Sequence, residues 1–135
     1  MKTVLARTYV VLSGLILVVV GIAGFFRHEM FNLTFPPTHN LFHLLSGAIA
    51  LFAGFRRNAN GPRLFGLIFG SVYTFVAIAG FAGLRDLGPI QLGLNLHFNV
   101  IHLGVGFLTL LAGFAIPKPT PLSPRSTEAN HANFH

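Results

Sequence analysis

Long apolar runs separated by short polar segments dominate the sequence. Lys, Arg, Asp and Glu avoid four stretches, about residues 4–26 (apart from Arg7 near its start), 41–55, 64–84 and 96–116. A membrane-spanning helix needs about 20 mainly apolar residues, and three of the stretches reach that length. The second reaches 18 residues if Thr38, His39 and Asn40 open the helix. We therefore predict one domain, residues 1–116, with transmembrane helices at about 4–26, 38–55, 64–84 and 96–116.

The two halves of the chain repeat one pattern. NLFHLLSG begins at Asn40, and NVIHLGVG begins at Asn99. Residues 21–55 align without a gap to residues 80–114, with 12 identities in 35 positions. A three-residue offset extends the match upstream, where Arg7, Tyr9 and Gly14 correspond to Arg63, Phe65 and Gly70. The predicted fold is therefore all-α, a four-transmembrane-helix bundle built from two tandem helical hairpins that cross the membrane the same way up.

The charges indicate how the bundle is oriented. The chain is 53% hydrophobic and 9% charged, whereas soluble domains carry about 25% charged residues. Seven of the nine basic residues precede the first stretch, join the second to the third, or follow the fourth. The positive-inside rule then places both termini in the cytoplasm, for a multi-pass protein of the bacterial inner membrane. Residues 117–135 are rich in Pro, Ser and Thr, and we expect a disordered cytoplasmic tail.

Small residues recur along each predicted helix. His43, Gly47, Ala50 and Gly54 share one face of the second helix, and His102, Gly106, Thr109 and Gly113 share one face of the fourth. In lipid, small residues at this spacing allow helix backbones to approach closely. Because all four helices carry such a stripe, we expect it to serve packing within one bundle rather than a dedicated dimerisation face.

The paired polar residues Asn40–His43 and Asn99–His102 are the candidate functional site. Unpaired polar side chains in hydrocarbon cost several kcal/mol, so these should point inward and find partners. Three interpretations stay open. The pairs hold the bundle together through hydrogen bonds; or His43 and His102 bind a haem or a chlorophyll-type pigment, supported by Asn40 and Asn99; or they line a small carrier. The carrier is disfavoured because no charged residue lies deep in a helix.

Other chemistries lack a signature in the chain. Cysteine is absent, and no Ser-His-Asp set, phosphate-binding glycine loop or His-Glu-x-x-His motif is present. We therefore predict no enzymatic activity and no catalytic residues. We assign no metal ligands, since zinc would need further ligands from His39, His97, Glu29 or Asp86 near the outer surface. No basic patch carries a nucleic-acid recognition motif, so no nucleic-acid partner is expected.

The repeated segments HNLFHLLSG and NVIHLGVG, together with GSVYTFVAIAGFAG and GIAGFF, resemble the bacterial membrane proteins known as domain of unknown function 4383. The resemblance covers about residues 5–115. It implies four helices, with an Asn–His element opening the second and a related His element opening the fourth. Members of the family often have Asp where this chain has Asn99. The resemblance implies a fold, a topology and a bacterial origin, and it brings no activity.

The sequence thus predicts an integral membrane protein of unknown activity, most simply a non-enzymatic accessory or assembly component. Its expected partners are the lipid bilayer and either further copies of the chain or a larger membrane complex. The alternative function is a haem- or pigment-binding membrane protein that uses His43 and His102.

Overall fold

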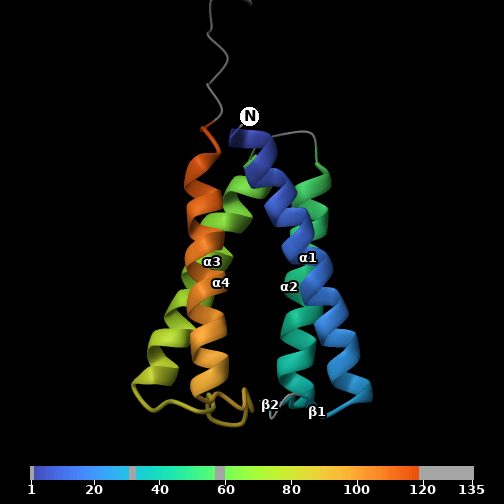
Figure 1. The fold of residues 1–135 in the computed structure, drawn as a ribbon, viewed down its shortest axis with the longest axis vertical. Coiled ribbons are helices and arrows are strands. Elements are labelled where there is room, and N and C mark those ends of the chain that lie inside the picture. The colour runs from blue at the N-terminus through green and yellow to red at the C-terminus, as the bar shows by residue number, and fades with distance from the viewer. Residues whose placement is uncertain (1, 31–32, 57–59, 119–135) are drawn as a thin grey trace, which may run out of the picture.

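Four helices form the computed structural model, which describes residues 2–30, 33–56 and 60–118 (Figure 1). The helices are α1 (Lys2–Phe26), α2 (Pro37–Phe55), α3 (Asn60–Phe81) and α4 (Leu96–Ala115), and a two-stranded antiparallel ladder joins β1 (Glu29–Met30) to β2 (Leu33–Thr34). Over the described residues, the fold is therefore all-α apart from this short ladder between α1 and α2 and an isolated bridge between Leu87 and Ile90. The predicted tail lies almost wholly outside the described residues.

The helix ends follow local chemistry. Pro37 occupies the first turn of α2, where a missing N–H removes no helical hydrogen bond. The side chain of Asn95 caps α4 by accepting a hydrogen bond from the Phe98 N–H at 3.0 Å. The predicted third helix, at about 64–84, differs from the structure at both ends, because α3 begins at Asn60, includes Gly61 and Pro62, and ends at Phe81. A proline is tolerated there because the first N–H groups of a helix have no intrahelical acceptor.

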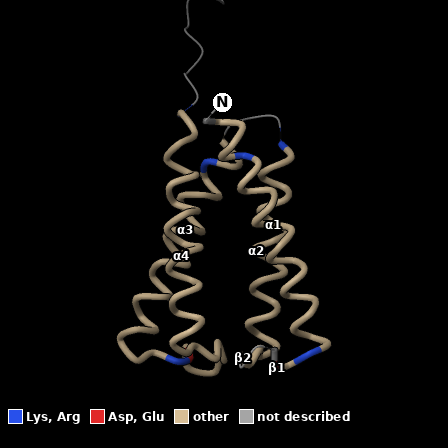
Figure 2. Tube along the Cα trace, in the orientation of Figure 1, with Lys and Arg blue, Asp and Glu red and all other residues tan. Residues whose placement is uncertain are grey.

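Three of the described helices are long and apolar enough to cross a membrane: Thr3–Phe26 within α1, Asn60–Phe81 and Leu96–Ala115. The 19 residues of α2 also include Thr38, His39, Asn40 and His43, which lower its hydropathy. Large apolar side chains are exposed along all four helices, and Lys and Arg gather near the two ends of the bundle (Figure 2). This distribution is typical of an integral membrane protein.

Within each hairpin, two helices meet through glycine. α1 packs chiefly on α2, and α3 chiefly on α4. A Cβ added to Gly14 would lie 3.1 Å from the Gly47 carbonyl oxygen, and one added to Gly70 would lie 3.0 Å from that of Gly106. These equivalent contacts place the predicted small-residue stripes inside the bundle. In both hairpins, only glycine permits so close an approach of two backbones.

The two hairpins make these contacts at corresponding positions. Gly54 lies against Val11 in the first hairpin, and Gly113 lies against Leu67 in the second. The equivalent residues of the second helices, Gly54 and Gly113, are 59 positions apart in the sequence, whereas those of the first helices, Val11 and Leu67, are 56 apart. Gly24 and Gly80, which meet Asn40 and Asn99, also correspond at 56 residues, so the three-residue offset extends past Gly21 in the first helix. Descent from a duplicated hairpin stays a prediction.

The hairpins contact each other through larger side chains. They lie side by side and are closest near the end that carries the N-terminus (Figure 1). There the Tyr9 hydroxyl of α1 lies 3.0 Å from Thr109 Oγ1 of α4, and small apolar clusters form around Val10 and Ile116. At the other end Phe35, Leu92, Leu94 and Phe98 form a separate buried cluster. The candidate site lies beside this second cluster.

The segment between α3 and α4 folds back onto the start of α2. Asp86 Oδ1 accepts hydrogen bonds from the backbone N–H groups of Leu92 (2.8 Å) and Gly93 (3.0 Å). Gly93 has a φ of +63°, which side-chain-bearing residues rarely adopt, and an added Cβ would lie 2.9 Å from Pro36 Cγ. The Thr38 hydroxyl donates to the Gln91 carbonyl. The loop is thereby held where its carbonyl groups can reach side chains of α2.

Candidate functional site: three histidines beside an apolar cavity

Three imidazoles, two from α2 and one from α4, lie together between the two hairpins. His39 and His43 come from the first two turns of α2, and His102 comes from α4. All three are buried, with 4%, 7% and 6% of their surfaces exposed. The ring centroids of His43 and His102 are 6.2 Å apart, and His39 lies 4.4 Å from the first and 5.6 Å from the second. The structure thus brings the two predicted histidines together and adds a third.

Hydrogen bonding determines which nitrogen of His39 faces the cluster. Its Nδ1 lies 2.7 Å from the Leu92 carbonyl oxygen. A carbonyl oxygen only accepts, so Nδ1 carries the proton, and in the neutral ring Nε2 has a free lone pair. That Nε2 lies 3.2 Å from Nε2 of His43. The loop carbonyl therefore orients His39 so that its basic nitrogen points into the cluster.

Aromatic side chains enclose the three imidazoles. The Phe98 ring stacks on His102 at 5.9 Å and contacts His39 at 4.7 Å. Phe35 meets His39 edge-on at 5.9 Å, and the Tyr73 ring lies 5.5 Å from His102. These contacts restrict the movement of each imidazole. Even so, Nδ1 of His43 and Nδ1 of His102 are buried without a hydrogen-bond partner among the described residues.

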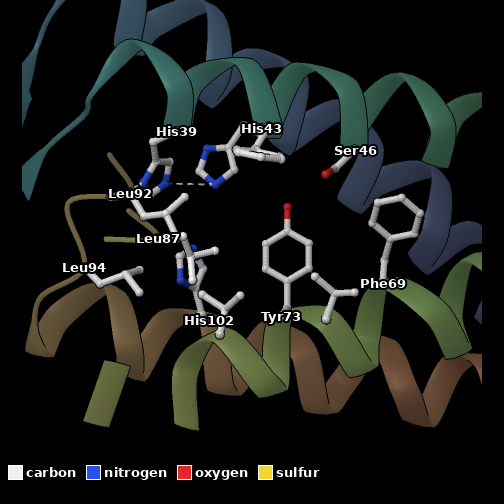
Figure 3. Close-up of a pocket in the computed structure, with 12 residues that line it drawn as sticks. His39, His43, Ser46, Phe69, Tyr73, Leu87, Leu92, Leu94 and His102 are labelled. Atoms are coloured by element: carbon white, nitrogen blue, oxygen red, sulfur yellow. Dashed lines mark hydrogen bonds between the residues drawn. The ribbon is translucent and has the colours of Figure 1, made fainter. Parts of the chain in front are cut away.

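A cavity of about 280 Å³ opens next to the histidines. Figure 3 shows His39, His43 and Ser46 of α2 on one side and Tyr73 and Phe69 of α3 on the other. The remaining lining residues are His102 of α4 and six apolar residues: Phe42, Val72, Val76, Leu87, Leu92 and Leu94. The cavity is therefore apolar, with a few polar groups at one end. Small-molecule sites have this composition.

The lining residues also indicate where the cavity opens. Phe42 of α2 and Val72 of α3 both line it, and they are 49% and 50% exposed. Both belong to helix faces that carry other exposed apolar side chains, such as Leu45 and Phe75. The cavity therefore opens between α2 and α3, on the same apolar outer surface of the bundle as these exposed side chains.

The predicted supporting residues Asn40 and Asn99 do not line this cavity. A Cβ added to Gly24 would fall 2.6 Å from Asn40 Cγ, and one added to Gly80 would fall 2.5 Å from Asn99 Cγ. Each amide thus packs on a glycine of its own hairpin. Asn40 Nδ2 also donates to the Phe35 carbonyl at 3.3 Å. The two members of each Asn–His pair therefore have different surroundings, although they share a helix.

His39 was considered in the sequence only as a distant zinc ligand near the outer surface. The sequence signal that places His39 beside His43 is their i to i+4 spacing, because residues four apart are neighbours on a helix. Of the other ligands considered, His97 and Glu29 are exposed, and Asp86 binds its own loop. His39, His43 and His102 form a group with one potential ligand nitrogen from each within 4.8 Å of the other two.

Comparison with known proteins agrees with the resemblance seen in the sequence. The family described as "Domain of unknown function (DUF4383)" matches residues 7–115, and the chain belongs to this family. No significant match was found among curated proteins or among solved structures.

Proposed function

For this member of a family without an assigned activity, we propose a non-enzymatic accessory or assembly role in the membrane, in which the protein binds a small lipid-soluble molecule between its hairpins. The observation that carries the proposal is the apolar cavity between α2 and α3, which opens beside exposed Phe42 and Val72. A molecule dissolved in the bilayer can enter there without crossing water. Its apolar part would replace contacts with lipid, and its polar end would meet Tyr73, Ser46 and the histidines.

The setting of the cavity supports a binding role rather than catalysis. Hydrolytic and proton-transfer enzymes commonly use a carboxylate, a nucleophile or a histidine oriented by a charged partner. Of the described carboxylates, Glu29 is exposed and Asp86 holds the backbone of its loop. Neither lines the cavity. We further propose that α2 spans the bilayer with the other three helices, that both termini are cytoplasmic, and that the exposed apolar faces contact lipid, further copies of the chain or a larger membrane complex.

A cavity-filling substitution tests this function. Val76 lines the cavity, whereas Val100 is 57% exposed on the outside of α4. We expect organic extraction and mass spectrometry of protein purified in mild detergent to recover a lipid-soluble molecule from wild type and from Val100→Phe. Val76→Phe should reduce that recovery at least tenfold while leaving helicity, measured by circular dichroism, unchanged. Equal recovery from Val76→Phe and Val100→Phe would contradict the proposal.

A haem or a chlorophyll-type pigment is the second candidate, because His43 and His102 face each other beside the cavity. The purified protein would then show a Soret band that is lost in His43→Ala and in His102→Ala. A macrocycle between these two imidazoles would have to displace His39, whose ring contacts both. A colourless protein that still releases a lipid-soluble molecule favours the first candidate.

A further inference from the structure

The three-histidine cluster has the arrangement of a metal site. We propose that His39, His43 and His102 bind one transition-metal ion of the zinc type. The proposal does not depend on the lipid-soluble molecule, because the cluster is built from side chains at one end of the cavity. Three neutral imidazoles without a carboxylate or thiolate suit Zn²⁺, Co²⁺, Ni²⁺ or copper, and they do not suit Mg²⁺ or Ca²⁺, which prefer oxygen ligands.

The distances within the cluster are close to those that zinc requires. Nitrogens bound at about 2.0–2.1 Å in a tetrahedral site lie about 3.4 Å from each other. The Nε2 atoms of His39 and His43 are already 3.2 Å apart. One potential ligand nitrogen from each of the three rings lies within 4.8 Å of the other two. A movement of at most about 1.4 Å by His102 would therefore complete a three-nitrogen set.

The surroundings of His39 match those of a metal ligand. Ligating histidines commonly donate their second N–H to a carbonyl or carboxylate, which fixes the tautomer and orients the ring. His39 Nδ1 donates a hydrogen bond to the Leu92 carbonyl at 2.7 Å. The backbone N–H of Leu92 in turn donates to Asp86 Oδ1 at 2.8 Å. Asp86 is thus a positioning residue that acts through the loop, and it brings a negative charge near the ion.

The protein alone leaves the cluster incompletely satisfied. Nδ1 of His102 is buried and lacks a partner among the described residues. The nitrogen of His43 that faces the cluster is Nε2, and it lies against Nε2 of His39 at 3.2 Å. Burying polar nitrogens without partners is unfavourable, and such groups commonly mark a site for an ion, a water or a ligand. With three protein ligands, a fourth position stays open toward the cavity. Water, or the polar end of a bound molecule, can occupy it.

The test uses the full chain in detergent, purified with a tag that contains no histidine and stripped with a chelator. We expect Co²⁺ to bind with one ion per chain, to give the visible absorption of a tetrahedral site, and to be displaced by Zn²⁺ but not by Mg²⁺. The sequence provides a matched substitution: Phe98 of the second hairpin corresponds to His39 of the first. His39→Phe, His43→Phe and His102→Phe should each weaken binding at least 100-fold.

Control variants test binding to three of the four other histidines, and His28→Phe provides the same test for the fourth. His97 is exposed on α4, and His131 and His135 lie in the tail. His97→Phe and a His131→Ala/His135→Ala double variant should bind Co²⁺ like wild type. A wild-type protein that binds less than one ion in ten chains would overturn the proposal, as would Co²⁺ binding that survives in His39→Phe. Metal-dependent stabilisation, read as a rise in melting temperature, provides a second measurement should a variant fold poorly.

Two further variants separate this site from its neighbours. Asp86→Ala removes the acceptor that holds Leu92, and we expect about 10-fold weaker Co²⁺ binding. Asp86→Asn keeps an Oδ1 acceptor and should restore most of that affinity together with the wild-type Co²⁺ spectrum. Val76→Phe, which fills the cavity, should retain the metal. If Val76→Phe keeps both Co²⁺ binding and its lipid-soluble molecule, the proposed function fails and the metal site stands. If wild type does not bind Co²⁺ but Val76→Phe still loses the lipid-soluble molecule, the metal site fails and the proposed function stands.

Discussion

The contacts within each hairpin and the contacts between the two hairpins follow different physical rules. Within a hairpin, glycines such as Gly14 and Gly47 bring two backbones together. Between hairpins, a tyrosine hydroxyl, small apolar clusters and three histidines fill the space, and a cavity of about 280 Å³ is left open. Close glycine packing leaves no room for a ligand. The cavity next to the histidines accordingly lies in the looser contact between the hairpins.

The largest effect should come from widening a glycine contact. In Gly113→Val, the new Cβ would lie 2.7 Å from the Leu67 backbone nitrogen and 2.8 Å from the Gly66 carbonyl carbon. Backbone atoms within a helix cannot move aside without separating α3 from α4. We expect a loss of about 3 kcal/mol in the free energy of unfolding, measured by denaturant titration with circular dichroism in detergent.

Gly104→Val is the matched control for this substitution. Gly104 belongs to the same helix, and an added Cβ there would meet nothing within 4 Å. Its free energy of unfolding should change by less than about 1 kcal/mol, because only helix propensity differs. Equal losses at positions 104 and 113 would show that close glycine packing does not hold the second hairpin together.

A second, intermediate effect tests whether the two hairpins are equivalent. Gly24→Ala and Gly80→Ala each place a methyl group on an asparagine amide, that of Asn40 in one hairpin and that of Asn99 in the other. We expect each to cost about 2 kcal/mol of unfolding free energy, since an overpacked site typically costs about 1–3 kcal/mol. Adding Asn40→Ala to the first and Asn99→Ala to the second removes the obstructing amide.

The double variants decide the interpretation. If the added methyl group meets the amide, the loss of unfolding free energy in Gly24→Ala/Asn40→Ala should be smaller than the sum of the two single losses by more than about 0.5 kcal/mol. The same should hold for Gly80→Ala/Asn99→Ala. Additive losses in one hairpin and coupled losses in the other would indicate that the two Asn–Gly contacts are not equivalent.

The helices and their inward glycines could be predicted because apolar length and small-residue spacing are local properties of the sequence. Ranges such as 38–55 for α2 lie within a residue or two of Pro37–Phe55. The predicted start of α3, near residue 64, is too late because Asn-Gly-Pro is typical of a turn and is also compatible with the first turn of a helix. Its assignment depends on packing, since an added Cβ on Gly61 would lie 2.9 Å from the Ala53 carbonyl oxygen.

The histidine pair could be predicted from the repeat, whereas for its third member the i to i+4 spacing places His39 beside His43 without indicating that it is buried with His102. His39 is buried beneath the carbonyl of Leu92, 53 residues later, which reaches its ring, and such a contact leaves no local trace in the sequence.

The different surroundings of Asn and His within each pair were not predicted either. Three residues turn a helix by about 300°, which leaves about 60° between their directions. That angle suffices for Asn40 to face α1 while His43 faces the other hairpin.

The smallest expected effect concerns the hydrogen bond that joins the hairpins near the N-terminus. Tyr9→Phe removes the hydroxyl that lies 3.0 Å from Thr109 Oγ1, while the ring continues to pack. Thr109 retains its bond to the Val105 carbonyl at 2.6 Å, so no buried hydroxyl is left unpaired. Hydrogen bonds between membrane helices contribute about 0.6 kcal/mol on average, and we expect a loss of that size in the free energy of unfolding. A double-mutant cycle with Thr109→Val isolates the interaction. A coupling above about 2 kcal/mol would mean that the hairpins depend on this bond as strongly as each depends on its glycines, and the contrast between the two kinds of contact would fail.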